Sequence, residues 1–286
     1  MLVIIGYIIV AVSVLGGFAL HGGSLGALFQ PFELLIIAGA ALGAFVCGNS
    51  SKVVKATLAS LPTTLQGSRF SKQRYLDLLA LLYEILNRVR REGLMSIEAD
   101  VEEPENSPLF QKYPALLADH HLMEFVTDYL RLMVSGNLNP LELEALMDQE
   151  IDTHHHEALI PSQAIQRIAD GLPAFGIVAA VMGVVNVMGS VGEPPAILGA
   201  KIGAALVGTF VGILLAYGVV GPLASVIEQK ASESGKQLEC IKVALLASLN
   251  GYAPALAVEF GRKVLFSTER PTFAELEDTV RGKSAA

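Results

Sequence analysis

The residue whose chemistry stands out is Thr209, a hydroxyl in the middle of a long apolar run. The run reads IGAALVGTFVGILLAYGVVGPLASV from Ile202 and holds no formal charge. A hydroxyl at membrane depth has two common uses. It can line the path of an ion, or it can bond the carbonyl group four residues back in its own helix. The sequence leaves both roles of Thr209 open.

Two prolines flank this run and the apolar run before it. Pro173 lies near the start of GLPAFGIVAAVMGVVNVMGSV, and Pro222 lies near the end of the run that holds Thr209. Pro173 could stand in the first turn of a helix capped by Asp170, where its missing N–H is harmless. The apolar pattern continues past Pro222, which predicts a kink. As a pair, the prolines indicate a hinge at the inner ends of two neighbouring helices.

The charged and histidine-rich clusters outside the apolar runs can be explained as solvated surface. Arg90 and Glu98 belong to a group of charges at the end of a helix predicted from Tyr75 to about Gly93, and a solvated helix end explains such a group. The histidines His154 to His156 are consecutive, so on a helix they point in different directions and suit solvated surface better than a metal site. No phosphate-binding loop or nucleophile motif is present. We therefore expect no cofactor and no enzyme activity.

Four apolar stretches must position these groups: residues 2–20, residues 34–47, and two within residues 171–226. Each of the last two reaches roughly 20 residues, the length a helix needs to cross a hydrocarbon layer of about 30 Å. The chain is 52% hydrophobic with a mean hydropathy of +0.51, which does not suit an ordinary soluble domain. In the second stretch, Gly39 and Gly43 have the spacing that lets helices approach closely in lipid. We predict an all-α integral membrane protein with four transmembrane helices.

The basic residues predict the orientation of these helices. The chain has 20 Lys and Arg residues, and all except Lys201 lie within residues 52–167 and 230–283. Basic residues collect on the cytoplasmic side of a membrane, which places both termini there. The predicted domains are 1–50, transmembrane helices 1 and 2 with a short periplasmic loop; 51–170, a large helical cytoplasmic loop; 171–226, transmembrane helices 3 and 4; and 227–286, a helical cytoplasmic tail.

Residues 243–258 form an uncharged stretch in the tail that could be taken for a fifth span. The stretch is short, is interrupted by Asn250-Gly251 and Pro254, and is flanked by charges. We therefore expect a helix pair in the cytoplasmic tail. Cys47 and Cys240 show no paired spacing and are expected to be reduced.

The predicted spans contain no Asp, Glu, Lys, Arg or His. The charges nearest to them only flank them: Glu33, Asp170, Glu193 and Lys201. An ion path needs a titratable or oxygen-rich site at membrane depth. Either the chain is not an ion path, or a helix of a partner supplies the carboxylate.

Four segments carry a resemblance to a known family: GGSLGALFQPFELLIIAGA from Gly22, LPAFGIVAAVMGVV from Leu172, VGTFVGILLAYG from Val207, and NGYAPALAVEFGRKVLFSTERP from Asn250. Along essentially its whole length, the chain resembles the flagellar motor stator subunits of the MotA/TolQ/ExbB proton channel family. The resemblance implies that five copies surround a pair of MotB helices, each with the missing aspartate. Protons would bind to and leave that aspartate, and the cycle would drive the ring against the rotor protein FliG.

The resemblance also implies roles for six residues. They are rotor contacts at Arg90 and Glu98, conformational prolines at Pro173 and Pro222, a channel-facing hydroxyl at Thr209, and an ion-selecting position at Ala180. Sodium-driven relatives have a threonine at that last position, and sodium needs several oxygen ligands, so alanine favours protons. Two alternatives remain: an energiser of the TolQ or ExbB kind, which has three spans and a periplasmic N-terminus, and a membrane scaffold without ion flux. The N-terminal pair of spans favours the motor subunit over the energiser.

Overall fold

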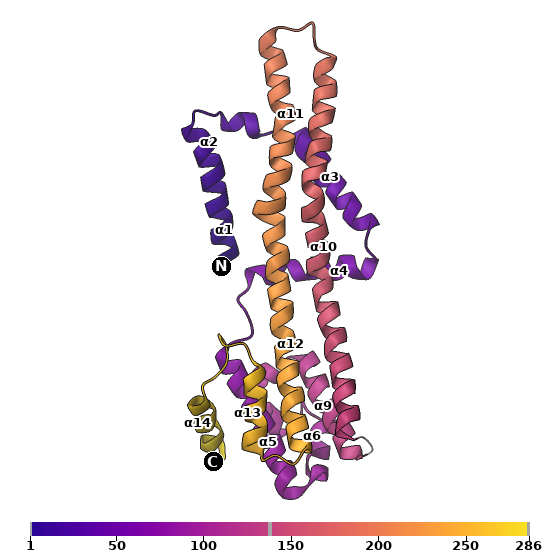
Figure 1. Cartoon of the computed structure of the whole chain (residues 1–286), viewed down its shortest axis with the longest axis vertical. Coiled ribbons are helices and arrows are strands. Elements are labelled where there is room, and N and C mark those ends of the chain that lie inside the picture. Colours follow the sequence, from indigo (N-terminus) through magenta and orange to yellow (C-terminus); the bar gives the residue numbers. More distant parts are fainter. Residues whose placement is uncertain (1, 137–138, 285–286) are drawn as a thin grey trace. The chain divides into compact units, whose positions relative to one another are not determined.

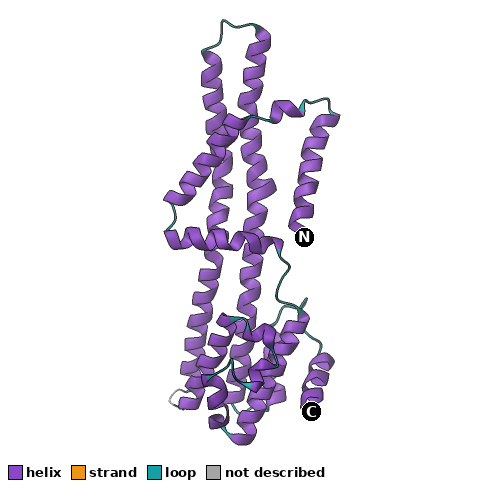
Figure 2. Cartoon of the chain, turned by 180° about the vertical axis from the view of Figure 1, so that it is seen from behind, coloured by secondary structure: helices purple, strands orange, loops and turns teal. Residues whose placement is uncertain are grey.

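The computed structural model describes residues 2–136 and 139–284, which form helices joined by short loops, without a strand (Figures 1 and 2). The chain divides into two compact units. Residues 1–67 and 158–229 form what we call the membrane unit, and residues 68–157 and 230–286 form what we call the polar unit. The described residues include four helical stretches that are long and apolar enough to cross a membrane, which confirms the predicted fold class.

The N-terminal part of the membrane unit holds the first two of these stretches. Its elements are α1 (Leu2–Ala11), a π turn (Val12–Gly16), α2 (Gly17–Leu20), a 3₁₀ turn (Leu25–Leu28), α3 (Pro31–Cys47), α4 (Ser51–Ser60) and a second 3₁₀ turn (Leu61–Leu65). Ser50 caps α4, because its Oγ accepts a hydrogen bond from the backbone N–H of Val53 at 3.4 Å. A β-carbon added at Gly39 or Gly43 would meet nothing within 4 Å, so the close approach expected there is not made within the described chain.

The other two membrane stretches belong to long helices. The elements are α10 (Pro140–Met188), α11 (Pro195–Leu215), the π turn η5 (Ala216–Val220) and α12 (Gly221–Leu249). The domain boundaries expected at residues 170 and 226 lie inside α10 and α12. A helix often ends at a glycine with positive φ. Among the described residues such glycines are Gly22, Gly93, Gly136 and Gly251, so Gly171 continues α10 into its apolar part.

The polar unit is built around one buried amphipathic helix, α5 (Lys72–Glu92). The other helices of this unit are α6 (Glu98–Glu102), α7 (Pro108–Gln111), α8 (Pro114–Leu117), α9 (His120–Ser135), α13 (Pro254–Val264) and α14 (Phe273–Ser284), with a 3₁₀ turn, η4, at Leu94–Ile97. Ser71 caps α5, and Gly93, with φ +85°, ends it as predicted. Leu79, Leu81 and Leu86 are completely buried in the core that α5 shares with its neighbours.

The apolar stretch 243–258 forms the end of α12 and the start of α13, joined by a turn at Gly251. Its residues Ala244 and Ala257 are completely buried in the core of the polar unit. The expected helix pair is therefore confirmed. Nearby, Cys240 is completely buried, and burial raises the pKa of its thiol, whereas Cys47 is exposed. Both thiols are free.

Candidate functional site

Glycines bring α10 and α11 into backbone contact, and the two helices lie side by side in both views (Figures 1 and 2). A β-carbon added at Gly176 would lie 2.9 Å from the carbonyl oxygen of Gly208, and one added at Gly212 would lie 2.9 Å from the Cα of Gly176. Two turns farther along α10, a β-carbon at Gly183 would lie 2.7 Å from the β-carbon of Ala205. Small residues allow such close packing in membranes. The contact therefore extends over several turns and depends on glycine.

Thr209 lies beside this contact. Its Cα would be 3.4 Å from a β-carbon placed at Gly176, and its side chain is partly exposed. Elsewhere in the chain, Thr127 donates a hydrogen bond to the carbonyl oxygen of Met123, four residues back. The hydroxyl of Thr209 makes no such bond within the part of the chain that the structure describes. It is therefore available to another chain.

Ala180 lies on α10, opposite the same stretch of α11. Its backbone nitrogen would lie 3.3 Å from a β-carbon placed at Gly208, the residue before Thr209. Ala180, like Thr209, is partly exposed. The structure therefore brings together the two residues that the resemblance assigned to the ion path.

An ion pair joins the loop between α10 and α11 to the start of α11. Lys201 Nζ lies 3.1 Å from a carboxylate oxygen of Glu193 and donates a hydrogen bond to Ser190 Oγ at 2.5 Å. Ser190 is buried. Glu193 lies in the loop and is paired with Lys201. It therefore does not provide a carboxylate within the α10–α11 contact.

Pro173 lies in the interior of α10, and Asp170 is itself helical. The expectation that Asp170 caps a helix whose first turn holds Pro173 is therefore wrong. Asp170 instead accepts a hydrogen bond from Gln166 at 2.8 Å. An interior proline removes a backbone hydrogen bond and crowds the carbonyl group four residues back, here that of Ala169. This weakens α10 one turn from Gly176, which favours bending at that point.

Pro222 follows a widened helical turn. In η5, the backbone N–H of Gly221 bonds the carbonyl oxygen of Ala216, five residues back. Pro222 is the second residue of α12 and is exposed. A π turn accommodates one extra residue, and interruptions of this kind accompany bends and functional sites in helices. The predicted kink region thus contains both a proline and a π turn.

Two neighbouring residues of α10, Pro161 and Ser162, had no role expected from the sequence. Pro161 is a second proline inside α10 and is buried. The hydroxyl of the next residue, Ser162, is also buried and donates a hydrogen bond to the carbonyl oxygen of Ala224 at 3.0 Å. This bond pairs the two helices two residues beyond Pro222. A Pro-Ser pair within a helical pattern is the one sequence signal that could have drawn attention to this position.

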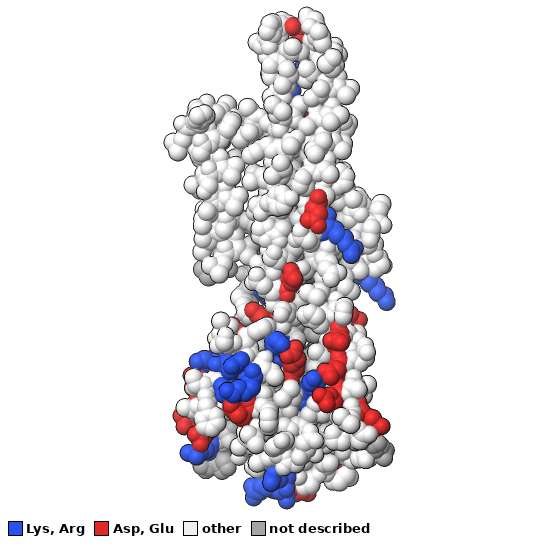
Figure 3. Space-filling model, viewed as in Figure 1, with Lys and Arg blue, Asp and Glu red and all other residues white. Residues whose placement is uncertain are grey.

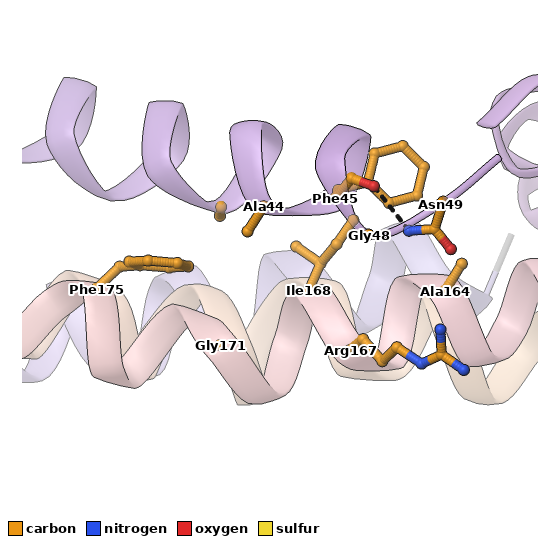
Figure 4. Close-up of a pocket in the computed structure, with 10 residues that line it drawn as sticks. Ala44, Phe45, Gly48, Asn49, Ala164, Arg167, Ile168, Gly171 and Phe175 are labelled. Carbon is orange, nitrogen blue, oxygen red and sulfur yellow. Dashed lines mark hydrogen bonds between the residues drawn. The ribbon is translucent and has the colours of Figure 1, made fainter. Parts of the chain in front are cut away.

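A cavity of about 190 Å³ lies between α3 and α10 (Figure 4). Phe45 and Phe175 are among its apolar walls, and Asn49 and Arg167 add polar groups. Asn49 donates a hydrogen bond to the carbonyl oxygen of Phe45 at 2.7 Å. Protein interiors are otherwise close-packed. Gly171 and Phe175, which precede and follow Pro173 by two residues, line this space, whereas Pro173 itself does not.

Arg90 and Glu98 lie in the polar unit, over which Figure 3 shows many charged side chains. Both are exposed, and Arg90 donates a long hydrogen bond of 3.5 Å to the carbonyl oxygen of Gly251. Glu98 makes no ion pair among the described residues. Their neighbour Arg88 differs, because it pairs at 2.6 Å with the buried carboxylate of Asp100. Arg88 therefore stabilises the unit, whereas Arg90 and Glu98 are accessible to a partner.

The histidine run is not uniformly solvated, which corrects the expectation for His154. His154 is partly buried, its Nδ1 has no hydrogen-bond partner among the described residues, and its ring centroid lies 6.0 Å from that of His121. Burial, and then the nearby His121, lower the pKa of His154. His156 is exposed, and its Nδ1 lies 2.7 Å from the carbonyl oxygen of Asp152. The described residues contain no group of three or more His, Cys, Asp or Glu side chains able to hold a metal ion.

Two solved structures share this fold. The structure of Campylobacter jejuni MotAB matches with a TM-score of 0.76 at 21% identity, over 93% of this chain and 95% of that one. The flagellar MotAB stator complex from Bacillus subtilis matches with a TM-score of 0.72 at 24% identity, over 90% and 92%. At these identities the likeness shows a shared helical fold along nearly the whole chain.

Sequence comparisons identify the family. Residues 4–93 match the family Motility protein A N-terminal, and residues 117–240 match the MotA/TolQ/ExbB proton channel family. Motility protein A of Escherichia coli (strain K12) is 54% identical over 281 residues, 98% of this chain and 95% of that one. Chemotaxis protein LafT of Vibrio parahaemolyticus is 39% identical over 273 residues, 96% of each chain.

The chain belongs to the MotA/TolQ/ExbB proton channel family, among its motility protein A members. This confirms the resemblance found in the sequence. It also confirms that the chain is a multi-pass membrane channel subunit of the flagellar stator type and not an enzyme.

Proposed function

We propose that five copies of this chain surround a pair of MotB helices and form with them the proton channel that turns the flagellar rotor. The observation that carries this proposal is the free hydroxyl of Thr209 beside a helix contact that has no acid of its own. Proton transfer at membrane depth needs a titratable group. An aspartate on each MotB helix supplies that group, and Thr209 faces it.

The proton cycle drives bending of α10 and of the η5–α12 region. When the partner's aspartate is protonated, its charge disappears, and the free energies of two conformations of the surrounding helices change relative to each other. Pro173 interrupts the hydrogen bonds of α10 near the α3–α10 cavity, which Gly171 and Phe175 line, and Pro222 has the π turn before it. These are the two places where the helices change direction. Arg90 and Glu98 in the polar unit then push on charged groups of FliG.

In the proposed orientation, the polar unit and both termini lie in the cytoplasm, where FliG is. The support is the distribution of charge: 19 of the 20 basic residues lie within residues 52–167 and 230–283. Lys201, the exception, is paired with Glu193 in the α10–α11 loop.

The transported ion is the proton. Ala180 lies beside the α10–α11 contact and offers no oxygen ligand there. A sodium ion would need several such ligands, whereas a proton needs one basic acceptor. Swimming speed and membrane current measured with sodium removed test this selectivity. Unchanged values are expected, and a strong dependence on sodium would contradict the assignment.

The central experiment is expression of the chain with and without MotB in cells that lack their own copies of both chains. We expect proton leak and restored motility only when both chains are present. A MotB variant with its membrane aspartate replaced by asparagine is the matched control and should abolish both. Absence of leak and of motility with intact, inserted complexes would contradict the proposal.

A further inference from the structure

A tyrosine in the first span contacts the π turn that precedes Pro222. The hydroxyl of Tyr7 donates a hydrogen bond of 2.9 Å to the carbonyl oxygen of Val219, which lies 212 residues away in the sequence. The helices also pack closely here, because a β-carbon added at Gly218 would lie 3.1 Å from a methyl carbon of Val10. α1 therefore contacts η5 through both a polar and an apolar interaction.

The acceptor of this bond, Val219, lies in the least regular part of the α11–α12 segment. Val219 is in η5, and Pro222 follows within three residues. Pro222 has no N–H, so it leaves the carbonyl group of Gly218 without its usual helical donor. Within an apolar membrane, water does not readily replace missing bonds to backbone groups. The Tyr7 hydroxyl bonds not this carbonyl group but that of the next residue, Val219, and so adds a hydrogen bond from another helix to the same weakened turn.

We propose that Tyr7 is a positioning residue for the hinge at Pro222: its hydrogen bond to Val219 stabilises the observed form of η5 and couples α1 to the bending of α11 and α12. This inference rests on the proposed function of Pro222 as a hinge. Tyr7 contacts neither Thr209 nor Ala180 by any bond among the described residues, so its effect on ion flux is indirect. Loss of one hydrogen bond changes the ratio of two conformations by about two- to tenfold.

Tyr7→Phe removes the hydroxyl and keeps the ring, which makes it the decisive variant. Full-length chain is co-purified with MotB into lipid nanodiscs, and amide hydrogen exchange is followed by mass spectrometry. We expect exchange at residues 216–224 to rise by about two- to tenfold, while exchange in α3 stays unchanged. In cells, stall torque should fall while the abundance of the complex stays normal. Unchanged exchange at residues 216–224, or an equal loss of torque and abundance, would overturn the proposal.

Tyr217→Phe is the matched control. Tyr217 belongs to the same π turn, is 72% exposed, and makes no hydrogen bond within the described part of the chain. Loss of its hydroxyl should leave exchange at residues 216–224 unchanged. If Tyr217→Phe raises exchange as much as Tyr7→Phe does, removal of any hydroxyl near the turn has the same effect. The role assigned to Tyr7 is then wrong.

A double variant tests whether Tyr7 acts through the hinge. Pro222→Ala restores the N–H at that position and makes the region a more ordinary helix. In this background, Tyr7→Phe should change exchange and torque much less than it does in the wild-type chain. Full additivity of the two changes would mean that Tyr7 acts elsewhere.

The wild-type chain separates this inference from the proposed function. If it gives no MotB-dependent proton flux, the function fails. If it gives normal flux and torque but Tyr7→Phe leaves exchange and torque unaltered, only the role of Tyr7 fails.

Discussion

Gly176 and Gly212 face each other across α10 and α11, with so little space between them that a β-carbon on Gly212 would lie 2.9 Å from the Cα of Gly176. Both prolines of the proposed hinges lie toward the same end of this contact, Pro173 three residues before Gly176 and Pro222 ten residues after Gly212. The glycine contact therefore holds the two helices together, and the prolines weaken the helices outside it.

Gly212→Ala should destabilise the complex. The added methyl group would overlap the backbone of α10, and such overpacking costs about 1–3 kcal/mol. For a chain of this size, 1 kcal/mol lowers the unfolding midpoint by about 2–4 °C. Thermal unfolding of the complex in lipid nanodiscs measures this effect. Gly203→Ala on the same helix is the control, because a β-carbon there meets nothing within 4 Å. Equal midpoints for the two variants would argue against the close contact.

Thr209→Val should reduce proton flux and swimming speed without lowering the abundance of the complex. Valine keeps the shape of the side chain but removes the hydroxyl, which has no partner among the residues that the structure describes. Thr209→Ser keeps the hydroxyl and should retain most of the flux. Membrane current of cells that express each variant with MotB compares them. If the serine variant is as impaired as the valine variant, the methyl group and not the hydroxyl is what matters.

His154→Phe should reduce the loss of stability in mild acid. Burial lowers the pKa of His154 below its ordinary value, so the unfolded chain takes up a proton at a higher pH than the folded chain does. The contribution of neutral His154 to the free energy of unfolding is therefore at its full value above about pH 6.5. It is lost as the pH falls toward the pKa of His154 in the folded chain. Unfolding midpoints measured between pH 7.5 and 5.5 test this. His156→Phe is the control, because His156 is exposed. The same pH dependence in wild type and His154→Phe would exclude this residue.

Reversing the charge of Arg90 or Glu98 should impair motility and leave assembly with MotB intact. Both side chains are exposed and make no ion pair among the described residues, and the one hydrogen bond of Arg90 within the unit is long, at 3.5 Å, so reversal is expected to affect chiefly a contact with a partner. Opposite reversals on FliG should restore part of the motility. Glu105→Lys, another exposed acid of the polar unit, should have little effect. Loss of membrane insertion in the Arg90 or Glu98 variants would show that these charges are structural.

The sequence was sufficient to predict the spans, the end of α5 at Gly93 and the helix pair around Gly251, because each depends on local signals. Uninterrupted apolar length marks a span, and a glycine with positive φ ends a helix. The continuity of α10 was harder to predict. Pro161 and Pro173 suggest breaks by local rules, but packing against neighbouring helices keeps the helix intact.

The details of the site depend on which residues of different helices face each other. The sequence shows glycines in both runs, but only the structure pairs Gly176 with Gly212 and leaves Gly39 and Gly43 without a neighbour. The bond from Tyr7 to the π turn has no sequence signal, because it joins residues 212 apart. The partial burial of His154 likewise arises from tertiary packing.

The two cysteines allow the orientation of the chain in the membrane to be measured by labelling. Cys240 is buried in the polar unit with a raised thiol pKa, so it resists alkylation, while Cys47 is exposed at the last residue of α3. A membrane-impermeant maleimide therefore finds a single reactive thiol without any engineered substitution. Labelling of inside-out vesicles, together with protection in intact spheroplasts, is the pattern that the proposed orientation requires.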